Sequence, residues 1–259
     1  MPRRALTWVA VTLLALLLVG AGGWLWLWER GRHAQAISEG RALADFRHAR
    51  AGTDDLRMLP GEPAPGVYTY AQRGHESGGI GPLGIDRELP GEARYTITAG
   101  TDGFSEKLAL AAEHIEAVRF RLTPAGARIA VWRRTDITFA GVGRDDRRDL
   151  TPPVLDLPAH PSVGLTWTAH YAAGNLDVHS TSAVLRRETI PVAGVPEPTL
   201  VIRSVGDTRG AHNSTRVDRV WWSPRLKIPV RWTIDMRVRG IVRLDTRTDL
   251  RLVSTRPMT

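Results

Sequence analysis

The stretch LKIPVRWTIDMRVRGIVRLDTRTDLRL, residues 226–252, alternates apolar and charged side chains almost without a break. Apolar residues dominate the even positions, and arginine and aspartate dominate the odd ones. Because successive side chains of a β-strand point to opposite faces, the pattern predicts two long antiparallel strands with one dry and one wet face. We therefore expect Trp232→Asp to unfold the domain and Arg231→Asp to be tolerated.

The position of the reversal within this hairpin is left open by the pattern, although Gly240 marks its neighbourhood. A turn centred on Ile241 creates two cross-strand ion pairs, whereas a turn centred near Arg239 creates one. The two pairs are Arg237 with Asp245 and Asp235 with Arg247, and the single pair is Asp235 with Arg243. Such pairs contribute only roughly 0.2–1 kcal/mol each, which is too little to choose between the turns.

Strand signals extend back to Val67. Alternating segments include AVRFRL at 117–122, LTWTAHY at 165–171 and LDVHSTSAV at 176–184. The glycine- and proline-rich stretch at 73–92 is interpreted as an exposed loop, and residues 106–117 have a mixed helix and strand character. The fold class is therefore mainly β, a curved antiparallel sheet resembling a half-barrel, preceded by one N-terminal transmembrane helix.

The first thirty residues carry that helix. Residues 5–28 are uncharged and long enough to cross the hydrocarbon layer. We expect a signal anchor at 1–30, a juxtamembrane helix and linker at 31–66, and an extracytoplasmic β domain at 67–259. We expect a single-pass cell-membrane protein whose C-terminal domain is extracytoplasmic. Cleavage near VGAGG at 19–23 is the alternative, and the arginines after the segment argue against an extracytoplasmic C-terminal domain.

Composition excludes several function classes. With 42% apolar residues among 259, the chain can bury a sizeable core, and its net charge of +8 comes from arginines scattered among acidic residues. That scatter indicates solvated strand faces rather than a nucleic-acid surface. The absence of cysteine excludes disulfides, thiolate metal sites and lipid attachment to a cysteine.

Two groups of polar residues are candidates for chemistry. In GHESGG at 74–79 the residues around Ser77 do not match the G-x-S-x-G elbow of serine hydrolases. His160, His170 and His179, with Asp177, have the side chains of a zinc site, but the alternation already places His170 and His179 on the wet face. We therefore predict no catalytic residue, no metal and no cofactor, and hence no enzyme.

The order of the later segments resembles a known class of proteins. A domain opening with GVYTY continues through LTPPVLDLPAHPSVGLTWTAHY and ETIPVAGVPEPTLVIRSV to RVWWSPRLKIPVRW. This order is similar to extracytoplasmic lipoprotein-carrier proteins and their uncharacterised periplasmic relatives, in which a half-barrel is closed over an apolar hollow. The chain departs from them in having neither a lipid-attachment cysteine nor a clear long helix for a lid.

The resemblance implies binding of a lipid or another apolar ligand of the cell envelope. The residues expected to contact it are Trp167, Tyr171, Trp222, Ile228 and Trp232. The alternative is a structural or interaction protein with a filled core, whose arginine-rich face docks an envelope protein partner. In both hypotheses the N-terminal helix binds the membrane and nucleic acid is not a partner.

Overall fold

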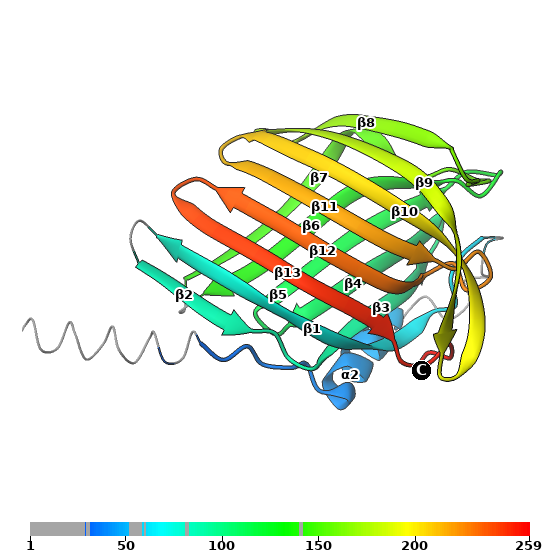
Figure 1. Cartoon of the computed structure of the whole chain (residues 1–259), viewed down its shortest axis with the longest axis horizontal. Helices are drawn as coiled ribbons and strands as arrows, with labels where there is room; N and C mark the ends of the chain where they lie inside the picture. Colours follow the sequence, from blue (N-terminus) through cyan, green and yellow to red (C-terminus); the bar gives the residue numbers. More distant parts are fainter. Residues whose placement is uncertain (1–28, 30–31, 52–58, 60, 81–82, 140–141) are drawn as a thin grey trace, which may run out of the picture.

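The computed structural model describes residues 29, 32–51, 59, 61–80, 83–139 and 142–259 of the chain. Within these described residues it has the helix α2 outside a large antiparallel β-structure (Figure 1). The elements are α2 (Glu39–Arg50), β1 (Gly66–Ile80), β2 (Leu83–Glu88), β3 (Glu92–Gly100), β4 (Gly103–Ala111), β5 (His114–Leu122), β6 (Arg128–Phe139), β7 (Val142–Leu157), β8 (Thr166–Ala173), β9 (Leu176–Val192), β10 (Val195–Gly210), β11 (Asn213–Trp222), β12 (Pro229–Arg239) and β13 (Val242–Leu252).

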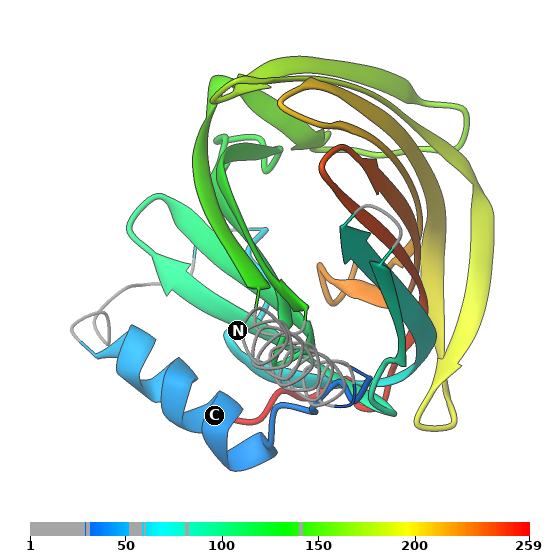
Figure 2. The ribbon, with the colours of Figure 1, turned by 90° about the vertical axis from the view of Figure 1, so that its left-hand side faces the viewer.

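The sheet closes on itself, so the predicted half-barrel is wrong. Neighbouring strands from β3 to β13 pair in sequence order, and β13 then pairs with β1 from Tyr70↔Leu252 to Ile80↔Val242. The result is a closed barrel of 12 antiparallel strands, seen end-on as a ring in Figure 2. Closure removes the free edges that an open sheet would expose. Strand β2 is additional and pairs with the second half of β1.

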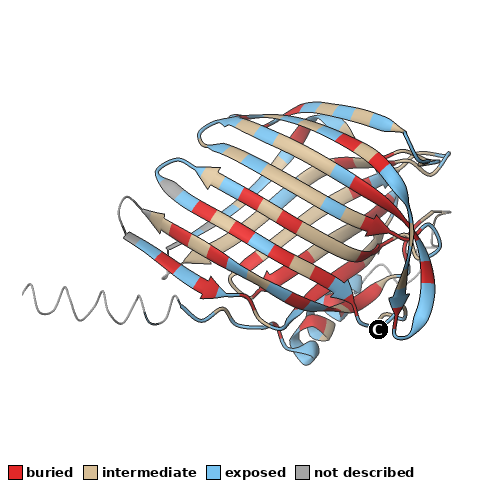
Figure 3. Ribbon diagram, viewed as in Figure 1, coloured by how far each residue is buried: buried red, intermediate tan, exposed pale blue. Residues whose placement is uncertain are grey.

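The final hairpin confirms the alternation. Its register pairs Asp235 with Arg247 and Arg237 with Asp245, so the reversal is centred on Ile241. Even positions of both strands face the barrel interior, and the alternation of buried and exposed residues is visible in Figure 3. The fully or nearly buried ones include Val230, Ile234, Met236, Leu244, Leu250 and Leu252.

The stretch at 73–92, interpreted from sequence as an exposed loop, forms most of β1 and all of β2 instead. Glu76 is completely buried inside the barrel, while His75 beside it points outward and is exposed. The six glycines of this region suggested turns, but a long strand that changes neighbours tolerates glycine where backbones approach closely. The ambiguous segment at 106–117 belongs to the hairpin of β4 and β5.

Helix α2 packs on the outside of the barrel wall (Figures 1 and 2). Ser38 caps its first turn by accepting a hydrogen bond from the Arg41 amide. The helix buries Ala42 and Phe46 against Val67 of β1 and Ala109 of β4. The helix expected between the anchor and the β domain is therefore docked on the barrel.

The predicted transmembrane anchor at 1–30 lies almost wholly outside the described residues. Among the residues that are described, no helix combines the length and the apolar character needed to cross a bilayer.

Candidate ligand-binding cavity

The inward-facing residues of the barrel leave a cavity of about 900 Å³. Pockets for small molecules commonly range over roughly 300–1,000 Å³, so this volume suffices for a substantial ligand. Large buried aromatic side chains fill part of the barrel interior. They are Tyr68, Tyr70, Tyr95, Phe104 and Phe120, of which Tyr95 and Phe120 also line the cavity.

Four of the five residues expected to contact a ligand line this cavity. Trp167 and Tyr171 come from β8, Trp222 from the end of β11, and Trp232 from β12. Ile228, the fifth, is fully buried in the core and does not line the cavity. Its backbone carbonyl instead accepts a hydrogen bond from the Ser223 amide in the turn before β12.

A buried ionic group lies on one wall of the lumen, around Glu76. The Arg87 guanidinium donates to Glu76 from Nη2 at 2.7 Å and from Nε at 3.1 Å, and the Thr246 hydroxyl donates to it at 3.1 Å. The His114 ring contacts the second oxygen of Glu76. Burial disfavours the charged carboxylate, but His114 and Arg87 outweigh it and lower the pKa of Glu76 to about 2.

The group continues across the lumen as a chain of alternating charges. His114 Nε2 lies 3.3 Å from a carboxylate oxygen of Glu116. Both carboxylate oxygens of Glu116 accept hydrogen bonds from Arg216 at 2.9 Å. Arg216 also donates to Asp218 at 2.8 Å, and Asp218 accepts the indole N–H of Trp232 at 2.9 Å. Strands β5 and β11 are six steps apart in the ring, so the Glu116–Arg216 pair joins opposite walls.

The pKa values of Glu76, His114 and Glu116 favour the charged form of all three side chains. Burial alone would lower the pKa of His114, but the carboxylates of Glu76 and Glu116 outweigh it and raise the pKa to about 9. Burial likewise opposes ionisation of Glu116, yet Arg216 and His114 hold its pKa well below the usual range. Sequence reasoning missed this group, although continuing the even-position alternation of VYTY through Glu76 would have placed it inside.

Further charged groups face the cavity close to these residues. Arg128 donates to Glu106 at 3.0 Å, and burial raises the pKa of the nearby Asp156 carboxyl. Arg133 is exposed within the lumen and donates to the hydroxyl of Tyr171 at 3.2 Å, with the carboxylates of Glu116 and Asp156 nearby. The cavity therefore combines aromatic walls with a solvent-accessible cation.

Among the neighbouring strands of the barrel, β7 and β8 share the fewest paired residues. Over their described residues these strands pair only at Leu150↔Ala173 and Thr151↔Ala172. Pro152 and Pro153 follow directly, and neither has an N–H to donate to a ladder. Beyond them the strands separate, and Trp167 packs in the same apolar cluster as Leu157. Both side chains also line the cavity, so the gap in hydrogen bonding lies beside it.

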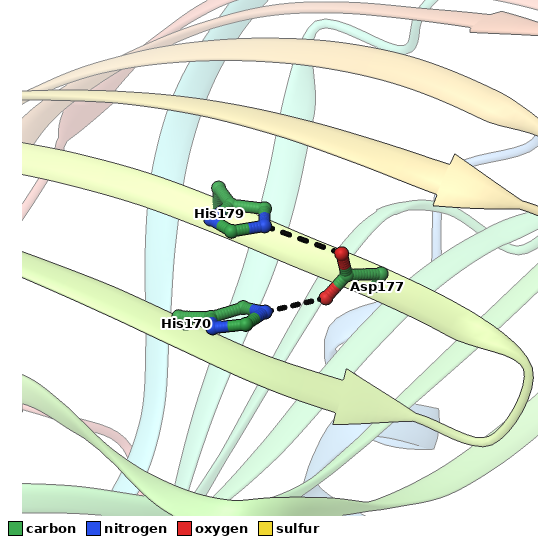
Figure 4. A group of neighbouring side chains, drawn as sticks. All are labelled: His170, Asp177 and His179. Atoms are coloured by element: carbon green, nitrogen blue, oxygen red, sulfur yellow. Dashed lines mark hydrogen bonds and ion pairs between the residues drawn. The ribbon is translucent and has the colours of Figure 1, made fainter.

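The histidines considered for zinc separate into two places. His170 and His179 lie beside Asp177 on the outer face of β8 and β9, as the alternation predicted (Figure 4). His160 is in the connection before β8, next to a smaller pocket lined also by Pro158 and Trp222, and is not part of that cluster.

The fold and this site define a closed antiparallel β-barrel with a mixed aromatic and ionic internal cavity. The sequence matches no protein-family model and no curated protein, and the structure matches no solved structure.

Proposed function

We propose that this chain is a binding protein that holds an amphiphilic ligand, with an apolar body and a polar end, inside its barrel. The observation that carries the proposal is the cavity of about 900 Å³ lined by Trp167, Tyr171, Trp222 and Trp232. An ordinary interior is packed to the density of an organic crystal, so a space of this size in a barrel is unusual for a purely structural protein with a filled core.

The apolar part of the ligand is expected against the aromatic walls and the aliphatic side chains between them. Ile202, Val220, Leu176 and Val178 supply that aliphatic surface. Burying apolar surface contributes roughly 25 cal/mol per Å², so the affinity for a chain-like or ring-like body would rise with the apolar area that it buries.

Arg133 is the residue we expect to contact the polar end. Its guanidinium is exposed in the lumen and donates its hydrogen bond to the Tyr171 hydroxyl, while the carboxylates of Glu116 and Asp156 are nearby. A carboxylate or phosphate could pair with this guanidinium in the two-point geometry that arginine favours. We therefore propose an anionic end group, and the gap between β7 and β8 as the route by which the ligand enters.

The proposal includes a location. Residues 1–30 would anchor the chain in the cell membrane, with the barrel on the extracytoplasmic side, where lipids and other envelope components are the available amphiphiles. The uncharged segment at 5–28 supports the anchor.

A first test asks whether the barrel carries a ligand. A chain beginning at residue 32, purified without detergent and checked for folding by circular dichroism, is examined by native mass spectrometry and by solvent extraction. We expect an adduct of lipid size that the solvent removes. A chain that is always empty and does not bind a fluorescent fatty acid would contradict the proposal.

A second test uses matched variants on β9. Ser180 faces the cavity, whereas Thr181 is exposed on the outer face. Ser180→Trp should fill the lumen and reduce binding of the fluorescent fatty acid at least tenfold, and Thr181→Trp should leave it unchanged.

A similar pair of variants tests the end group of the ligand. Arg133→Gln should weaken binding of the fluorescent fatty acid, whereas Arg134→Gln, which loses an ion pair with Asp145 on the outer face, should not.

A further inference from the structure

Two histidines and one aspartate form a compact group on the outer face of the β8–β9 hairpin (Figure 4). His170 and His179 are direct cross-strand partners in the register of the two strands. Asp177 precedes His179 by two residues on β9, and the period of two in a strand places its side chain on the same face. The three residues are therefore positioned by backbone pairing rather than by a loop.

The atoms of the three side chains that could bind a metal ion lie close together. His170 Nε2 lies 2.7 Å from Asp177 Oδ1, and His179 Nε2 lies 3.2 Å from Oδ2. The two imidazole rings are nearly parallel, with centroids 4.0 Å apart and planes inclined by 14°. One possible metal-binding atom from each side chain falls within 4.8 Å of the others. Both rings direct their Nε2 atom towards the Asp177 carboxylate.

We propose that His170, Asp177 and His179 bind a divalent transition-metal ion of the zinc class on the outside of the barrel. Imidazole nitrogen and carboxylate oxygen are common zinc ligands, at about 2.0–2.2 Å from the ion. Ligand atoms at that distance in tetrahedral geometry lie about 3.3–3.6 Å from one another. The 3.2 Å contact of His179 already has nearly this spacing, and the 2.7 Å contact of His170 must open by roughly 0.6–0.9 Å. Three protein ligands leave a fourth position for water.

The hydrogen bonds alone give little reason for this arrangement. All three side chains are at least half exposed, at 64%, 53% and 50% for His170, Asp177 and His179, and exposed ion pairs contribute only about 0–1 kcal/mol. On the neighbouring β10, Asp207 is paired with His179 and Arg209 with Asp177. One acidic and one basic residue thus flank the site, and their charges offset each other.

Metal binding is tested on the full chain without an affinity tag. Zn²⁺ is titrated by isothermal calorimetry, and Co²⁺ by the visible absorption that reports its coordination number. We expect one saturable site, weakened tenfold or more in His170→Ala, in His179→Ala and in Asp177→Asn. His75→Ala is the matched control, because His75 is also an exposed histidine on the outer face of a strand, and it should bind like the parent chain.

A stability measurement gives an independent reading. An ion that binds only the folded state raises the melting temperature, so saturating Zn²⁺ should stabilise the parent chain and the His75→Ala variant but not the His170→Ala/His179→Ala variant. The absence of saturable binding would overturn the proposal. Binding that the double variant retains would assign the ion to other residues and overturn it equally.

Discussion

Trp232 lies where the apolar wall of the lumen meets the ionic chain that crosses it. Its ring lines the cavity, and its indole N–H donates to Asp218 at 2.9 Å. Arg231, the preceding residue, lies on the outer face, donates to both oxygens of Asp249 at 3.0 and 2.8 Å, and covers the Trp221 ring. Adjacent residues of one strand thus belong to different environments.

Substitutions at these two positions should therefore differ in cost. Trp232→Asp removes a large packed ring and places a carboxylate beside Asp218, so we expect a loss of about 3–5 kcal/mol in the free energy of unfolding. Arg231→Asp loses a partly exposed pair and should cost at most about 2 kcal/mol. Urea denaturation measures both, and equal losses would contradict the assignment of faces.

His114 should make the stability depend on pH. Its pKa is raised to about 9 in the folded protein, above the ordinary value near 6.5. A group with a raised folded pKa stabilises the fold fully below the unfolded pKa and loses that contribution as the pH rises through the folded one. Between pH 6.5 and 9.5 the chain should therefore lose up to about 3 kcal/mol.

The control for this prediction is His114→Gln, which cannot be protonated. Its free energy of unfolding is expected to be lower at pH 6.5 but to change much less towards pH 9.5. Chemical denaturation at several pH values compares the two slopes. If the parent chain and the variant share the same slope, the Glu76–His114–Glu116 group is not the source of the pH dependence.

At the scale of the element, β1 shows why part of the fold was predictable and part was not. The last hairpin is local: its two strands are adjacent in sequence, and alternation with a turn near Gly240 suffices to pair them. In β1, pairing with β3 ends at Ala71↔Glu92 and pairing with β2 begins at His75↔Glu88. The glycines near this change of partner are typical of a loop, so the sequence pattern predicted a loop there instead of a strand.

Gly74 lies at that change of partner and has no room for a side chain. A Cβ there would overlap the backbone of Arg247 and lie 2.7 Å from the Cα of Thr248 on β13. We expect Gly74→Ala to cost about 2–3 kcal/mol, as overpacking typically does. Gly84→Ala is the matched control, since its nearest neighbour would be 3.8 Å away, and it should change stability by less than about 1 kcal/mol. Thermal melts that show equal shifts would contradict this close approach.

At the scale of the whole molecule, the decisive feature is the pairing of β1 with β13. The two strands are the first and last of the ring, and local patterns in the sequence say nothing about such a distant partner. The same closure turns a curved sheet into a lumen. It brings the aromatic residues of β8, β11 and β12 around one cavity, and it brings Glu116 and Arg216 face to face. Trp167, Tyr171 and Trp232 line that cavity because their inward direction follows from alternation, and Trp222, named from the resemblance, joins them. Ile228 belongs to a turn where alternation no longer applies.

Closure can be tested directly because the chain has no cysteine. Ala71 and Arg251 are both exposed and are register partners across β1 and β13, and paired residues of antiparallel strands have Cα atoms about 4.5–5.5 Å apart. An Ala71→Cys/Arg251→Cys variant treated with a short bifunctional thiol reagent should form an internal crosslink that alters its mobility in a denaturing gel. In Ala71→Cys/Arg243→Cys the second cysteine lies eight residues earlier in β13 than position 251, about 26 Å away, and should not be crosslinked. Equal behaviour of the two variants would mean that β1 and β13 are not paired in this register, and an open sheet would then replace the barrel.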